Sequence, residues 1–141
     1  MACLTFTAAQ FVRPTMKEPP HEALLVGASV PGEVSQVFER ACQDCHSNNT
    51  RWPWYAKVTP VSFLVAKDVS RGRQFLNLSE WQKYSRGQKL GYLAGMADAA
   101  RNRKMPPRIY RTMHSDARLS DQERRLIAAW AAEERKRVAE R

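Results

Sequence analysis

Two cysteines and a histidine form the stretch whose residue types point most clearly to chemistry. Cys42 and Cys45 are three positions apart, and His46 follows directly. This spacing is typical of a c-type haem attachment site. The two thiols would form thioether bonds to the haem vinyl groups, and the imidazole would supply one axial ligand to the iron. On a helical turn the three side chains share one face, so all three can meet one flat ligand.

Other sites that use paired cysteines fit this sequence less well. A zinc site needs a fourth ligand, usually from a second pair of Cys or His residues at short spacing. The remaining candidates, Cys3, His21 and His114, stand alone in the sequence. A thioredoxin-like dithiol requires strands alternating with helices around the motif, and no such alternation is visible. A structural disulfide stays open as an alternative, but it would not account for the histidine.

Met105 is the main candidate for the second axial ligand. Pro106 and Pro107 follow it, and two prolines stop a helix and hold the chain extended. A thioether is a soft ligand that suits haem iron opposite a histidine. Two alternatives remain open: Met105 is an ordinary apolar core residue, or His114 is the second ligand and the iron has two histidines.

Three large rings crowd into a segment that is expected to be a loop. Trp52, Trp54 and Tyr55 lie there, beside Asn48-Asn49 and Pro53, which interrupt regular structure. Loops rarely hold so many large rings unless these cover something apolar. We therefore expect the three rings to shield the edge of the haem. The alternative is a small separate hydrophobic cluster.

Hydrophobic periodicity predicts an all-α domain whose helices position these residues. The expected helices cover residues 31–44, 60–75, 86–103 and 120–139, with a short helix starting near residue 79. The first of them has an apolar stripe and delivers Cys42 at its last turn. The whole is interpreted as a small cytochrome c-like helical domain, wrapped around one covalently attached haem.

The ends and the inner faces of the helices can also be predicted. Ser120 and Glu123 form a capping box, and Thr59 and Ser79 are expected to be N-caps. The helix over residues 60–75 is expected to turn its apolar side chains inward. These are Val61, Leu64, Val65 and, less clearly, Phe63.

The N-terminal part of the chain differs from the rest in composition. Residues 2–12 are apolar but too short to span a bilayer, so they are interpreted as the remnant of a signal or anchor segment, or as a loose terminus. Residues 13–31 hold four prolines and are expected to form an extended linker. The predicted organisation is therefore an N-terminal segment over residues 1–30 and a haem-binding domain over residues 31–141.

The charge of the chain is concentrated in its central part. The net charge is +9, and residues 51–118 hold 14 basic against four acidic residues. A basic surface favours acidic partners, so we expect a redox partner protein with an acidic docking face. Nucleic acid is not expected as a partner, since no nucleic-acid-binding motif accompanies the charge. A merely solvated basic face is the alternative.

Several longer motifs resemble those of the small bacterial haem-binding domain proteins, a branch of the class I c-type cytochromes. The matching segments are C-Q-D-C-H-S-N-N-T at 42–50, W-P-W-Y at 52–55, P-V-S-F-L-V-A-K-D-V at 60–69, G-R-Q-F-L-N-L-S-E-W at 72–81, M-P-P-R-I-Y at 105–110 and H-S-D-A-R-L-S-D-Q-E at 114–123. The resemblance implies thioether attachment through Cys42 and Cys45, His46 as the proximal ligand and Met105 as the distal ligand. It also implies a location outside the cytoplasmic membrane, with an N-terminal membrane tether in the full-length form.

The function expected from the sequence is that of a monohaem c-type cytochrome, which transfers electrons and is not an enzyme. It would act in the periplasm or at the outer face of the membrane, with one haem c as its cofactor. The competing hypothesis is a haem-based gas or redox sensor, or a weak peroxidase, with an open or labile sixth coordination position. A third hypothesis is a basic adaptor in which the haem is only structural.

Overall fold

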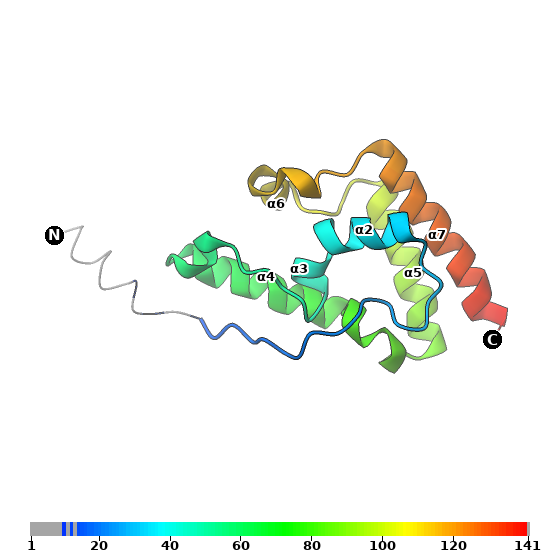
Figure 1. The fold of residues 1–141 in the computed structure, drawn as a ribbon, viewed down its shortest axis with the longest axis horizontal. Coiled ribbons are helices and arrows are strands. Elements are labelled where there is room, and N and C mark those ends of the chain that lie inside the picture. The colour runs from blue at the N-terminus through cyan, green and yellow to red at the C-terminus, as the bar shows by residue number, and fades with distance from the viewer. Residues whose placement is uncertain (1–9, 11, 13, 141) are drawn as a thin grey trace.

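The computed structural model describes residues 10, 12 and 14–140, and all regular structure within this part of the chain is helical (Figure 1). The fold class predicted from the sequence is therefore confirmed. The helices are α2 Gly32–Ala41, α3 Gln43–His46, η1 Trp54–Lys57, α4 Val61–Phe75, η2 Leu78–Lys83, α5 Arg86–Arg101, α6 Arg108–Met113, η3 Ser115–Ala117 and α7 Asp121–Glu140.

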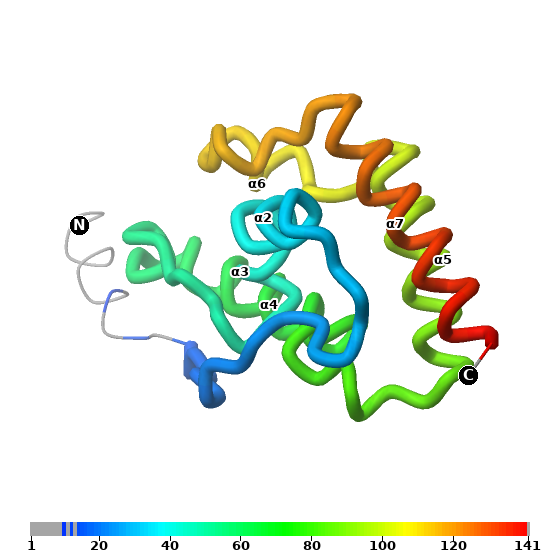
Figure 2. Tube along the Cα trace, turned by 45° about the vertical axis from the view of Figure 1, so that its right-hand side comes forward, coloured from blue at the N-terminus to red at the C-terminus, as the bar shows by residue number. Residues whose placement is uncertain are grey.

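The hydrophobic core lies where α2 packs against the antiparallel pair formed by α5 and α7 (Figures 1 and 2). The rings of Phe38 on α2 and Trp130 on α7 meet edge to face, with their centroids 5.3 Å apart. Leu93 and Met96 of α5 and Trp81 of η2 are buried in the same cluster. Burial of these large apolar groups is the main source of stability for this side of the molecule. By contrast, α4 packs against α3 and η1, away from this core.

The N-terminal segment is extended, as expected, but it packs along the helical body rather than acting as a free linker. Leu25 is buried in the core, and its backbone N–H donates to the Leu78 carbonyl oxygen at 2.8 Å. The Trp130 Nε1–H donates to the Ser29 carbonyl oxygen at 2.9 Å. The anchor interpretation of residues 2–12 falls mostly outside the described residues. In the described part of the chain, no helix combines the length and hydropathy needed to cross a membrane.

The helix expected over residues 31–44 is divided into two at Cys42. Helix α2 ends at Ala41, and Cys42, with φ −123°, precedes the single turn of α3. The backbone N–H groups of Cys45 and His46 both donate to the Cys42 carbonyl oxygen, at 3.3 and 3.0 Å. The motif therefore forms a helical turn of its own.

The helix ends agree with the sequence in one place and differ in two. The capping box is confirmed, because the Glu123 backbone N–H donates to Ser120 Oγ at 3.2 Å and the Ser120 N–H donates to a Glu123 carboxylate oxygen at 2.7 Å. The prediction for Ser79 was wrong: Asn77 caps η2 and accepts from the Ser79 N–H. Thr59 does not cap α4, because its hydroxyl donates to the backbone of the N-terminal segment.

The inner face predicted for α4 was also wrong. Leu64 is 60% exposed and Phe63 is 42% exposed, and Val61 is exposed as well, whereas Ser62 and Val69 are buried. Gly72 of α4 lies close to the backbone of α3, and the helix buries its less apolar side. Periodicity identifies an apolar stripe on a helix, but it does not identify the side on which the neighbouring helix lies.

Candidate functional site

The imidazole of His46 is held in the state that a metal ligand requires. Its Nδ1 is hydrogen-bonded to the Leu76 carbonyl oxygen at 3.0 Å. Because a carbonyl oxygen only accepts, this ring nitrogen carries the proton and Nε2 keeps its lone pair. Burial lowers the pKa of His46, although the hydrogen bond to Leu76 acts in the opposite direction. The side chain is therefore neutral, and its free nitrogen is available to a metal.

The two cysteines of the motif are free thiols: Cys42 directly precedes α3, and Cys45 lies within it. Burial raises the pKa of Cys42 to about 12 and that of Cys45 to about 11. The neighbouring thiol adds to the shift at Cys42, and the carboxylates of Asp44 and Asp68 add to it at Cys45. Both thiols are thus mainly protonated at neutral pH, and a thiol is a weaker nucleophile than a thiolate.

A cavity of about 320 Å³ opens between the motif and α5. We call it the α5-side cavity. Its lining includes Cys42 and His46 of the motif, Gly91 and Gly95 of α5, and Met105 from the loop after α5. Most of the remaining lining side chains are apolar: Phe38, Phe75, Leu76, Leu78, Tyr92, Met96, Ala99, Ala100, Pro106, Leu119 and Ile127.

A second cavity, of about 400 Å³, also borders the motif, and its lining includes residues of α4 and α6. We call it the α6-side cavity. It is lined by Cys45 and Tyr110 among others, and it shares five residues with the α5-side cavity: Cys42, His46, Phe75, Met105 and Pro106. The shared lining brings Met105 to the same site as His46, although 59 positions separate them in the sequence. The loop over residues 104–107 therefore borders the same cavities as the motif.

Comparison with known protein families shows which ligand this chain binds. A family model described as a haem-binding domain matches residues 4–133. The chain belongs to the haem-binding domain family. Haem binding and the all-helical fold, both expected from the sequence, are therefore confirmed. No curated protein and no solved structure was found to match the chain.

The residues of this haem-binding domain fit a flat, largely apolar cofactor. A Cβ atom added at Gly91 or Gly95 would meet no described atom within 4 Å, so one face of α5 is open and flat where it borders the cavity. The donor set beside it, two thiols, an imidazole nitrogen and a thioether, is the set that haem iron and haem vinyl groups use. Phe75 and Met105 are 70% and 43% exposed while lining the cavities, so apolar surface remains there for a ligand to cover.

We expect Gly95→Leu to prevent haem binding by filling the α5-side cavity. The new side chain would project into the open space that borders Gly95. Gly87→Leu is the matched control, because Gly87 lies on the same helix but outside the cavity lining. A Cβ added at Gly87 also meets no described atom within 4 Å. Both changes favour the helix by up to about 1 kcal/mol. The haem absorbance per protein should fall severalfold in the first variant only; equal loading would contradict this cavity as the haem site.

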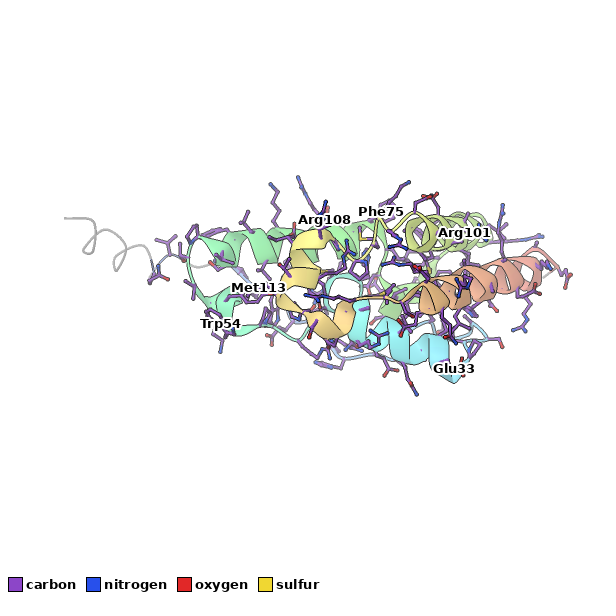
Figure 3. All side chains as sticks on the ribbon, turned by 90° about the horizontal axis from the view of Figure 1, so that it is seen from above. Glu33, Trp54, Phe75, Arg101, Arg108 and Met113 are labelled. Carbon is purple, nitrogen blue, oxygen red and sulfur yellow. The ribbon has the colours of Figure 1, made fainter. Side chains whose placement is uncertain are left out.

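The three rings predicted to shield the haem lie outside the lining described for the two cavities. Trp54 is 72% exposed (Figure 3) and packs edge to face on Tyr55, whose hydroxyl is hydrogen-bonded to His114 Nε2 at 2.7 Å. Trp52 Nε1 is buried with no hydrogen-bond partner among the described residues. The lining described for the two cavities includes neither these three rings nor His114. Their contact with haem stays a prediction that the cavity lining does not support.

Two residues of the site were missed by sequence reasoning. Asp44, between the two cysteines, is buried and accepts hydrogen bonds from Arg51 and Tyr110. Gly72 of α4 lies so close to α3 that an added Cβ would be 2.3 Å from the Cys45 carbonyl oxygen. An isolated glycine inside a helical pattern often has a packing reason, so Gly72 carried a detectable signal. Nothing in the sequence indicated the partners of Asp44.

Proposed function

We propose that this haem-binding domain is a monohaem c-type cytochrome that transfers electrons and catalyses no reaction of its own. The observation that carries the proposal is the joint lining of the two cavities by Cys42, His46 and Met105, with Cys45 beside them. Haem, when bound, supplies a one-electron couple at its iron.

Each residue has a distinct part in this proposal. The Cys42 and Cys45 thiols hold the cofactor covalently, which matches the spacing of the motif. His46 is the proximal ligand, and its hydrogen bond to Leu76 orients the ring and favours coordination through Nε2. Met105 is the distal ligand, and its thioether favours a high reduction potential. The apolar lining would keep water away from bound haem, which would also favour a high reduction potential.

Basic side chains at the cavities supply positive charge for acidic groups. Lys104 lines the α5-side cavity and Arg71 lines the α6-side cavity. Such cations suit the haem propionates or the carboxylates of a partner. We propose an acidic redox partner, met in the periplasm or at the outer face of the cytoplasmic membrane, and we expect this encounter to weaken as salt rises.

Replacing Met105 tests the ligand assignment. We expect Met105→Ala to lower the reduction potential, since axial ligands set haem potentials over about 0.8 V. The sulfur-to-iron absorption band in the red region of the oxidised protein should disappear. Met113→Ala is the control, because Met113 is exposed on α6 and outside the lining described for either cavity. An unchanged band in Met105→Ala would refute the assignment.

Gas sensing or weak peroxidase activity is the competing hypothesis, and the partial exposure of Met105 is the observation that favours a labile ligand. A peroxidase needs a distal acid or base, and His114 is the residue that we consider for this role. The His114 Nε2 is hydrogen-bonded to the Tyr55 hydroxyl. The His114 ring stacks on the Tyr110 ring, with 4.2 Å between the two ring centroids. Adding carbon monoxide to the ferrous protein separates the hypotheses. Fast, tight binding supports a sensor or enzyme, and an unchanged spectrum supports electron transfer.

A further inference from the structure

The carboxylate of Asp44 is the centre of a buried hydrogen-bond cluster inside the haem motif. Its Oδ1 accepts from the Arg51 backbone N–H and from Arg51 Nε, both at 3.1 Å. Its Oδ2 accepts from Arg51 Nη2 at 3.3 Å and from the Tyr110 hydroxyl at 2.8 Å. Only 7% of Asp44 is exposed. A buried carboxylate is stable only when it is paired and hydrogen-bonded, so these contacts form one unit.

Tyr110 connects this unit to the loop that carries Met105. It lies on α6, five positions after Met105, and Pro106 and Pro107 fill the start of the interval. Two prolines restrict the backbone of this interval strongly. Burial and the hydrogen bond to Asp44 raise the pKa of Tyr110, so its hydroxyl stays protonated and can donate. The position of the Tyr110 ring is thus transmitted to Met105 through a short, stiff segment.

The other end of the same loop is fixed to α5 and α7. The Met105 backbone N–H donates to the Ala99 carbonyl oxygen at 3.4 Å. The buried Arg124 donates through Nη1 to the carbonyl oxygens of Ala100 and Met105, both at 3.2 Å. The loop therefore has one attachment to the helical core and a second one, through Tyr110, to the motif turn itself.

We propose that Asp44 is a positioning residue, which holds Met105 in place through Tyr110 and sets how easily an external ligand displaces it. The inference rests on the proposed function, in which Met105 is the distal ligand. Displacement requires the loop to move away from the motif, and the hydrogen bond between Tyr110 and Asp44 resists that movement. A weaker hydrogen bond raises the population of the state in which Met105 is displaced. The apparent binding of a competing ligand then tightens by the same factor.

Imidazole binding to the ferric haem-loaded protein measures this population. Hydrogen bonds to charged groups contribute enough that losing one should tighten apparent imidazole binding about tenfold or more. We expect this in Tyr110→Phe, which removes one oxygen atom, and in Asp44→Asn, which keeps the shape but removes the charge. Tyr84→Phe is the matched control, because the Tyr84 hydroxyl accepts from the Asn77 backbone N–H and the residue lies outside the lining described for either cavity. It should bind imidazole like the unaltered protein.

Met105→Ala sets the upper limit for the tightening of imidazole binding. It also separates the claim that Met105 is a ligand from the claim that Asp44 positions it. If it fails to tighten imidazole binding, Met105 is not the ligand and the proposed ligation is wrong. If it tightens binding while Tyr110→Phe and Asp44→Asn do not, the ligation stands and the positioning role of Asp44 is overturned. Equal tightening in Tyr110→Phe and Tyr84→Phe would indicate general loosening of the fold and would overturn that role as well.

Discussion

Replacing both Cys42 and Cys45 with serine is expected to abolish covalent haem attachment completely. A hydroxyl does not form the thioether bonds that the motif supplies, whereas His46 and the apolar cavities remain to bind haem without a covalent bond. After denaturation, the unaltered protein made with a cytochrome maturation system should keep the mass of the chain plus one haem. The double variant should show the mass of the chain alone, and acidified acetone should extract its haem.

Cys3→Ser is the matched control, since it is the same substitution at the third cysteine of the chain, outside the motif. It should leave the attached mass unchanged. The pyridine haemochrome spectrum should show thioether-substituted haem in the control and unsubstituted haem in the double variant. Haem that stays attached after denaturation of the double variant would contradict the assignment of both cysteines. So would an unaltered protein with the bare polypeptide mass.

The second large effect is expected from Gly72→Ala, a change of one methyl group. The added Cβ would lie 2.3 Å from the Cys45 carbonyl oxygen and 2.9 Å from its carbonyl carbon. Both are backbone atoms, so α3 and α4 must move apart. Overpacking of this kind typically costs about 1–3 kcal/mol, and the movement displaces Cys45 and His46 from the cavities. We expect a lower Tm of the haem-free protein and a lower haem content after maturation.

Gly87→Ala provides the control for this substitution, because an added Cβ there meets no described atom within 4 Å. Alanine is favoured over glycine in a helix by about 1 kcal/mol, so this variant should be at least as stable as the unaltered chain. A Gly72→Ala protein with the Tm and haem content of Gly87→Ala would show that the two backbones do not meet as described.

Local sequence determined the parts of this protein whose chemistry depends on neighbouring residues. The spacing of Cys42, Cys45 and His46 defines the motif within one helical turn, so no distant contact is needed to predict it. The capping box of Ser120 and Glu123 is equally local, and it formed as predicted. Apolar periodicity was enough to predict the main helices and the all-α class, because each helix must bury one stripe.

Tertiary structure alone decided which surfaces face the haem site. The stripe on α4 was visible in the sequence, but the close approach at Gly72 turned a different side of the helix toward α3. Asp44 gained its role from Tyr110, 66 positions away. The glycines that border the α5-side cavity have no side chain to produce a periodic signal. Contacts between distant segments depend on how whole helices pack. The hydrophobic pattern indicates which face of a helix is apolar, but it does not indicate which helix packs against that face.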